Sequence, residues 1–179
     1  PESARLAIVA ATAQLGRYPD PAGFDLKQAL AARWSVPQNW LTLGNGSNDI
    51  LELVASALLE PGSSVVYAQH AFVVYRLATQ ARGARHLVVP AKDFGHDLPA
   101  MLEAIDGTTR VVFIANPNNP TGTYLPNAEL EAFLEAVAQR HGTRVTVVLD
   151  EAYNEFLEPE QRVDSVGLVK SYANLLVSR

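Results

Sequence analysis

The chain of 179 residues contains no cysteine, which excludes disulfide bonds, thiolate catalysis and cysteine-based zinc sites. No apolar run approaches the roughly 18 residues that a membrane-spanning helix requires. A basic cluster is also missing, and the formal net charge of −5 argues against a nucleic-acid surface. Residues 1–5 lack the basic stretch and apolar core of a signal peptide. These absences predict a cytoplasmic enzyme or enzyme fragment with no nucleic-acid or membrane partner.

Two common kinds of ligand site also lack their sequence signals. The four histidines have no metal-like spacing, so we predict no metal site. The glycine turn at residues 44–49 lacks the third glycine of a dinucleotide fingerprint and the lysine of a P-loop. No acidic residue obviously ends the strand that follows, at residues 65–68. A dinucleotide-binding domain is therefore disfavoured.

Short β-rich runs alternate with amphipathic helical patterns along the chain, which is typical of a layered α/β fold. Continuously apolar runs such as Val111–Ala115 predict strands buried on both faces of a mostly parallel sheet. Helices should cover both faces, giving three α/β/α layers with no domain boundary inside residues 1–179. We expect helices at residues 3–14, 25–34, 49–60, 72–82, 98–105 and 127–141. We expect strands at residues 41–43, 65–67, 86–89, 110–115, 145–149 and 175–178.

Polar side chains follow two of these predicted strands. One strand leads into the loop Asn-Pro-Asn-Asn-Pro-Thr-Gly at residues 116–122, and the other ends in Asp-Glu-Ala-Tyr at residues 150–153. The carboxyl ends of strands in an open α/β sheet form the edge where ligands bind. An amide, a phenol and a carboxylate together suit a flat heteroaromatic ring with a hydroxyl on one edge and a basic nitrogen on another. Pyridoxal phosphate is such a ring.

Asp150 is the strongest single candidate for a functional residue. A carboxylate that faces the pyridine nitrogen keeps this nitrogen protonated, so that the ring can accept electrons from the substrate's Cα carbanion. The competing interpretation is an aspartate at a strand end that only caps a loop. The asparagine loop and Tyr153 on the same inferred edge favour the functional interpretation.

The asparagine loop and the Asp-Glu-Ala-Tyr strand end, in this order, resemble the fold-type-I aminotransferases that use pyridoxal phosphate. The likeness is greatest to the histidinol-phosphate aminotransferase branch. It begins at Tyr18-Pro19-Asp20, continues through the turn at residues 44–49 and reaches residues 174–179. The resemblance therefore covers nearly the whole chain, and its two main motifs are specific in combination.

The resemblance implies roles for residues around the cofactor ring. Asp150 and Tyr153 would be catalytic, and Asn119 would join Tyr153 in hydrogen-bonding the phenolic oxygen. Phe72 would stack on the ring, although many family members have tyrosine there. Without the resemblance, Asn119 is an ordinary turn residue, and the two aromatic residues are packing residues. Tyr18 would reach the cofactor phosphate of the neighbouring subunit, which implies a homodimer.

The turn at residues 44–49 precedes a predicted helix, and the first N–H groups of a helix can bind phosphate. Ser47 and Asn48 would add side-chain donors beside Gly46. The simpler interpretation is a glycine-rich connection in which Ser47 or Asn48 caps the helix. The resemblance implies that the cofactor phosphate binds here.

The resemblance also implies that the chain is an excerpt, a partial large cofactor-binding domain without the N-terminal arm and the C-terminal domain. Family members continue past the last strand to a lysine that holds the cofactor as a Schiff base, and this chain ends before it, at Arg179. Lys27, Lys92 and Lys170 occupy other positions and are expected to be surface cations. The excerpt alone is therefore predicted to be inactive.

The implied function is pyridoxal-phosphate-dependent transamination between a small amino donor and a 2-oxo acid. The donor and acceptor would be histidinol phosphate and 2-oxoglutarate, in histidine biosynthesis. Aspartate or aromatic aminotransferases and a threonine-phosphate decarboxylase-like enzyme share these motifs and remain alternatives. A non-enzymatic regulator with an aminotransferase-like domain is a further alternative.

Overall fold

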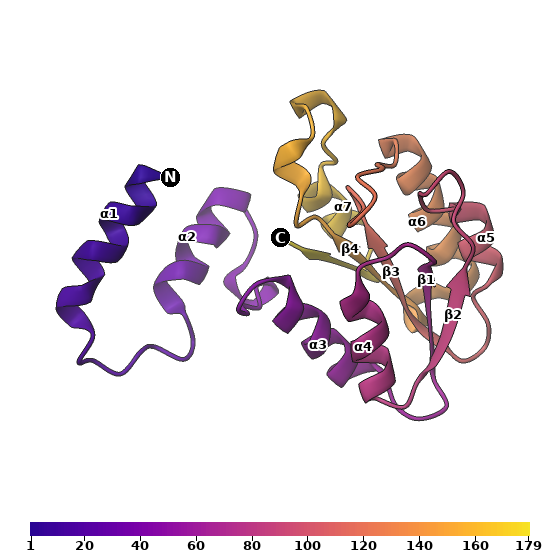
Figure 1. The fold of residues 1–179 in the computed structure, drawn as a ribbon, viewed down its shortest axis with the longest axis horizontal. Helices are drawn as coiled ribbons and strands as arrows, with labels where there is room; N and C mark the ends of the chain where they lie inside the picture. Colours follow the sequence, from indigo (N-terminus) through magenta and orange to yellow (C-terminus); the bar gives the residue numbers. More distant parts are fainter. The chain divides into compact units, whose positions relative to one another are not determined.

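The computed structural model describes all 179 residues, which form two compact units, Pro1–Leu43 and Gly44–Arg179 (Figure 1). No feature of the sequence indicates this division. The assignment of all residues to part of one larger domain stays a prediction. None of the helices combines the length and apolarity needed to span a bilayer.

The first unit consists of helices and loops. Helix α1 (Glu2–Ala11) tightens into a 3-10 turn at Thr12–Gln14, so the predicted helix at residues 3–14 is confirmed. Helix α2 (Phe24–Trp34) also matches its prediction, and a 3-10 turn follows at Gln38–Trp40. The strand predicted at residues 41–43 is wrong, because this segment pairs with no neighbouring strand. Its apolar alternation alone cannot satisfy the backbone N–H and C=O groups.

The second unit is built on five parallel strands in the order β2-β1-β3-β4-β5. The predicted parallel sheet is therefore confirmed. The chain adds β2 on one side of β1 and then β3 on the other side of β1. Open α/β sheets bind ligands at such a change of side. The strands are β1 (Ser64–Ala68), β2 (Arg85–Val89), β3 (Thr109–Ala115), β4 (Thr146–Asp150) and β5 (Leu175–Ser178).

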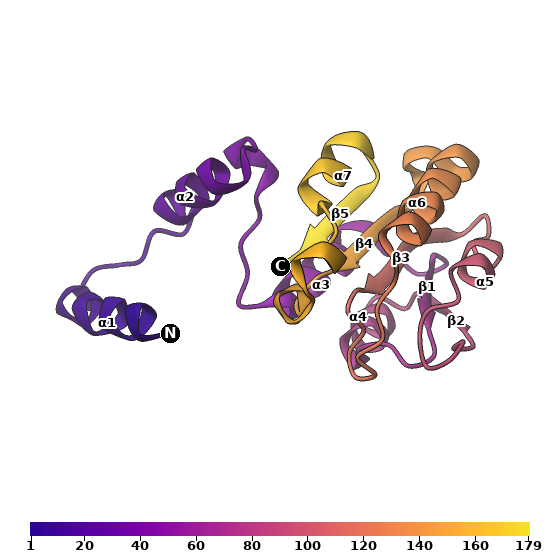
Figure 2. The same cartoon turned by 90° about the horizontal axis from the view of Figure 1, so that it is seen from above.

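Helices cover both faces of the sheet, as predicted (Figures 1 and 2). One core contains side chains of α3 (Ser47–Leu58) and α4 (Val73–Ala81). The other contains side chains of α5 (Leu98–Glu103) and α6 (Asn127–His141), with α7 (Ser165–Ser171) packed against it. Val111 and Phe113 of β3 enter the first core, whereas Val112 and Ile114 enter the second. This alternation of buried side chains follows from the two-residue period of a strand and explains its unbroken apolar sequence.

Four of the five helices of this unit begin and end within two residues of their predicted positions, and no bounds were predicted for the fifth, α7 (Ser165–Ser171). The helix predicted at residues 127–141 is observed with these bounds, because its apolar stripe is regular and Gly142 ends it with φ of 58°. The helix predicted at residues 72–82 starts one residue later, with Phe72 as its N-cap.

Candidate functional site

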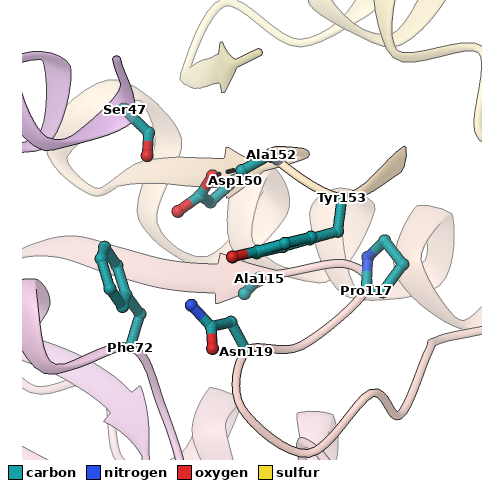
Figure 3. A pocket seen from close by; sticks show the side chains of 8 residues that line it. All are labelled: Ser47, Phe72, Ala115, Pro117, Asn119, Asp150, Ala152 and Tyr153. Carbon is teal, nitrogen blue, oxygen red and sulfur yellow. Dashed lines mark hydrogen bonds between the residues drawn. The ribbon is translucent and has the colours of Figure 1, made fainter. Parts of the chain in front are cut away.

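A pocket lies at the carboxyl ends of β3 and β4, next to the start of α3 (Figure 3). It brings together five of the residues that the sequence predicted for the site and adds three apolar ones. All eight belong to the second unit. The lining residues are Ser47, Phe72, Ala115, Pro117, Asn119, Asp150, Ala152 and Tyr153.

Asp150 is the last residue of β4 and is only 4% exposed. Its carboxylate accepts a hydrogen bond from the Tyr75 hydroxyl at 2.9 Å and one from the Ala152 backbone N–H at 3.3 Å. Burial raises the pKa of Asp150 because it removes water from the charged form, and the two hydrogen bonds act in the opposite direction. The pocket therefore contains a buried carboxylate with few partners inside the protein.

The loop after β3 presents Asn119 to the pocket and uses its other asparagines for structure. Asn116 accepts the backbone N–H of Leu125 at 2.8 Å, and Asn118 donates to the carbonyl of His70 at 2.8 Å. The Asn116–Pro117 and Asn119–Pro120 peptide bonds are both cis. Asn119 thus differs from the other two asparagines of the loop in lining the pocket, where its amide lies on the side of Phe72 (Figure 3).

Tyr153 follows β4 on a turn and is 43% exposed. Its hydroxyl is directed into the space between Phe72, Asn119 and Asp150 (Figure 3). No hydrogen bond joins Ser47, Asn119, Asp150 and Tyr153 to one another. Their polar groups are therefore available to a bound molecule.

The turn before α3 places a helix N-terminus at the pocket. Gly46 adopts φ of 78°, a left-handed value that suits glycine, and Ser47 then begins the helix. No side chain caps the helix, so the N–H groups of its first turn have no partner in the chain. Such a terminus attracts anions. Gly46 and Asn48 belong to this turn but do not line the pocket.

Asn45 and Asp49 hold the turn in shape. The backbone N–H and the side-chain amide of Asn45 both donate to one carboxylate oxygen of Asp49, each at 2.9 Å. These bonds lower the pKa of Asp49. Gly44 has no space for a side chain, because an added Cβ would lie 2.8 Å from the Asp49 Cβ.

Phe72 forms the aromatic wall of the pocket. It is the N-cap residue of α4, and its ring packs edge-on against Tyr75, with centroids 6.0 Å apart and planes at 88°. The arrangement leaves the Phe72 ring at the side of the pocket (Figure 3).

Tyr75 is the residue that the sequence analysis missed. It is fully buried and contacts two pocket residues, Phe72 and Asp150. The sequence pattern that could have identified Tyr75 is its position three residues after Phe72 at the start of a helix, because this spacing places the two side chains on one face. Tyr18 lies in the first unit and is 92% exposed, and its role stays a prediction.

The pocket combines a buried carboxylate, an amide, a phenol, an aromatic face and a helix N-terminus. This set fits a planar ring that carries a basic nitrogen, an oxygen and a phosphate. The family profile described as "Aminotransferase class I and II" matches residues 1–179. The chain belongs to the class I and II aminotransferases.

Similar proteins in this family have narrower names. The chain is 63% identical over all its 179 residues to histidinol-phosphate aminotransferase 1 of Cupriavidus pinatubonensis, of which it covers 46%. It is 60% identical to histidinol-phosphate aminotransferase 2 of Ralstonia nicotianae, of which it covers 47%. The chain thus spans about half the length of these curated relatives.

Solved aminotransferase structures have the same fold. Histidinol-phosphate aminotransferase from Sinorhizobium meliloti, in complex with pyridoxal 5'-phosphate, is 28% identical and superposes with a TM-score of 0.88. The match covers 99% of this chain and 47% of that chain.

Proposed function

We propose that residues 1–179 form part of the large domain of a longer pyridoxal-phosphate-dependent aminotransferase. Its full-length form would transfer the amino group of histidinol phosphate to 2-oxoglutarate, in histidine biosynthesis. The observation that carries the proposal is the pocket in which Asp150, Asn119, Tyr153 and Phe72 meet at the N-terminus of α3. The identity of 63% to a histidinol-phosphate aminotransferase supports this choice of substrate.

When bound, pyridoxal phosphate supplies an electron-accepting ring that stabilises a carbanion at the substrate's Cα. Asp150 would hold a proton on the pyridine nitrogen, since a buried carboxylate with two donors has room for a third partner. The burial that raises the pKa of Asp150 also strengthens its attraction to a cationic ring nitrogen. Asp150 and Tyr153 are the proposed catalytic residues of this chain.

Asn119 and Tyr153 would hydrogen-bond the phenolic oxygen of the ring, and Phe72 would lie against the ring face. The polar groups of Asn119 and Tyr153 enter the same space without bonding each other, as such a shared acceptor requires (Figure 3). Phe72 keeps the π face needed for stacking and has no hydroxyl.

The cofactor phosphate would bind the first turn of α3 through backbone N–H groups and the Ser47 hydroxyl. Gly46 and Asn48 would shape this turn and present further donors. Tyr18 would reach the phosphate of a partner subunit in a homodimer. None of the three lysines lines the pocket, so we propose that the Schiff-base lysine belongs to another part of the full-length protein.

Asp150→Ala in the full-length protein tests the proposed chemistry. We expect transamination to slow by several orders of magnitude, each factor of ten corresponding to about 1.4 kcal/mol of barrier. Glu131→Gln removes a negative charge from the exposed face of α6 and should leave the rate unchanged. Near-normal turnover of Asp150→Ala would remove Asp150 from the site.

The substrate is tested by comparing kcat/KM for histidinol phosphate, aspartate and phenylalanine with 2-oxoglutarate as acceptor. We expect histidinol phosphate to give the highest value. A preference for aspartate or phenylalanine would show that the protein is an aminotransferase with an amino donor other than histidinol phosphate. Binding of the cofactor without transfer from any donor would instead favour a regulator, and release of carbon dioxide from threonine phosphate would favour a decarboxylase.

A further inference from the structure

Tyr75 is held in one position by aromatic packing on three sides. Its ring stacks on Phe113 with centroids 4.6 Å apart and planes at 6°. Phe72 and Tyr67 complete the contact as T-shaped pairs with Tyr75, at centroid distances of 6.0 Å and 6.4 Å. Its side chain is fully buried, and α4 fixes its backbone. The hydroxyl therefore has a fixed position in the molecule.

The Tyr75 hydroxyl is a permanent donor at this position. Burial strongly raises the pKa of Tyr75, and the neighbouring Asp150 charge raises it further, so the phenol keeps its proton. It donates to Asp150 Oδ2 at 2.9 Å, and it is the only side chain that hydrogen-bonds this carboxylate. Hydrogen bonds to an ionised acceptor are about twice as strong as neutral ones. Tyr75 therefore stabilises the charged form of Asp150 and fixes one of its two oxygens.

We propose that Tyr75 is a positioning residue, which holds the Asp150 carboxylate charged and oriented toward the pocket through its single hydroxyl. The role at the ring nitrogen rests on the function proposed above. A buried tyrosine also needs a hydrogen-bond partner simply to be stable, and the experiment must separate this structural need from positioning.

The first measurement is the titration of the Asp150 carboxyl, followed by ¹³C NMR in the cofactor-free full-length protein. Tyr75→Phe keeps the ring packing and removes only the hydroxyl, so Asp150 should titrate at higher pH than in the wild type. The control is Tyr67→Phe, because Tyr67 is a buried residue whose hydroxyl contacts His86 Nδ1 at 2.9 Å and not Asp150. This variant should leave the titration of Asp150 unchanged. An unchanged titration in Tyr75→Phe would overturn the proposal.

The second measurement is the dissociation constant of pyridoxal phosphate in a double-mutant cycle. Tyr75→Phe should weaken binding about tenfold when Asp150 is present, because a carboxylate whose pKa rises by about one unit loses about 1.4 kcal/mol of its preference for the charged form. In the Asp150→Asn background it should have little effect, because no carboxylate remains to be positioned. Equal losses in both backgrounds would show a purely structural role and contradict the proposal.

Failure of the proposed function is distinguishable from failure of this inference. If the wild type does not bind pyridoxal phosphate, the proposed function is wrong, whereas the NMR titration still decides whether Tyr75 controls the Asp150 charge. Should Tyr75→Phe fail to fold, 3,5-difluorotyrosine at residue 75 provides the same test with opposite sign. Its more acidic phenol donates more strongly, so Asp150 should titrate at lower pH, and no change would refute the proposal.

Discussion

At the scale of single residues, the pocket depends on polar groups that have no partner among themselves. Tyr153 is one of them, with a hydroxyl in the pocket and a ring beside Phe156, at a centroid distance of 6.0 Å. If this hydroxyl bonds the phenolic oxygen of the cofactor, its removal costs one hydrogen bond to a charged group without disturbing the core.

Tyr153→Phe should therefore weaken cofactor binding about 10- to 100-fold, the range for a hydrogen bond to a charged group. The stability of the fold should hardly change. Tyr124→Phe is a matched control, since Tyr124 is 45% exposed and its hydroxyl accepts a bond from Gln161 away from the pocket. Equilibrium titration with pyridoxal phosphate measures the dissociation constants of both variants. Equal affinities of the two variants would rule out the role of Tyr153.

Residue type and strand position predicted that Asp150, Asn119 and Tyr153 lie at one edge of the sheet, whereas their roles came from the resemblance and stay predictions. Polar residues directly after buried parallel strands must meet at one sheet edge, and the structure brings these three to one pocket. Tyr75 could not be predicted in the same way. Its partner Asp150 lies 75 residues away, and only the packing of α4 on β3 and β4 brings the hydroxyl to the carboxylate.

At the scale of elements, the apolar period predicted all five strands of the sheet and four of the five helices that pack against it, whereas no bounds were predicted for the short helix α7. The segment at residues 41–43 has a strand-like alternation, but it lacks a pairing partner. The helix predicted from residue 49 starts at Ser47, because Gly46 supplies the turn that directs the chain into α3. Pairing and turn geometry depend on tertiary contacts, which a local pattern does not contain.

Gly44→Ala tests whether the turn before α3 controls phosphate binding. The added Cβ would lie 2.8 Å from the Asp49 Cβ and 3.0 Å from Ile50, so the turn must shift. We expect a loss of about 1–3 kcal/mol in the free energy of unfolding, together with weaker cofactor binding. Gly107→Ala is the control, since its Cβ would meet nothing within 4 Å. Urea denaturation and cofactor titration measure the two effects. Unchanged cofactor binding in Gly44→Ala would contradict the proposal that the phosphate binds at this turn.

Asp106 stabilises the amino-terminal ends of two strands, at the end of the sheet opposite to the pocket. Its carboxylate accepts bonds from Thr108, Ser64 and Arg85, and thereby links the starts of β1 and β2. The pKa of Asp106 is held well below its usual range, chiefly because the Thr108 hydroxyl donates to it. A carboxylate with a lowered pKa in the folded state binds fewer protons there than in the unfolded chain. Its contribution to stability is therefore present at neutral pH.

We expect this contribution to be lost as the pH falls from about 4, the value for an aspartate in an unfolded chain, toward the lower pKa of the folded state. Asp106→Asn should lower the free energy of unfolding at pH 7. It should also make this free energy vary less with pH between pH 4 and pH 2. The free energy of unfolding, measured in urea at several pH values, tests this. Glu131→Gln serves as the control for the loss of one charge. An acid dependence as steep as that of the wild type in Asp106→Asn would contradict the assignment.

At the scale of the whole molecule, the chain covers about half the length of its relatives, and the proposed role of Tyr18 concerns the site of a partner subunit. The pocket lies in the second unit, whereas Tyr18 is an exposed residue of the first. An exposed tyrosine that serves a partner's phosphate requires a dimer with shared sites.

Mixing full-length subunits defective at Tyr18 with subunits defective at Asp150 tests the shared site. In each heterodimer, one of the two sites has both functional residues. Random exchange of equal amounts should therefore restore up to about a quarter of wild-type activity. Transamination assays after subunit exchange give the recovery. No recovery despite proven exchange would count against donation across the dimer.

The central claim is that the pocket binds pyridoxal phosphate with its ring nitrogen at Asp150. A crystal structure of the full-length protein with pyridoxal phosphate tests it most directly. We predict a distance of about 2.7–2.9 Å between the Asp150 carboxylate and the pyridine nitrogen, with the phosphate at the first turn of α3. A cofactor bound elsewhere, or a ring nitrogen that faces away from Asp150, would contradict the account.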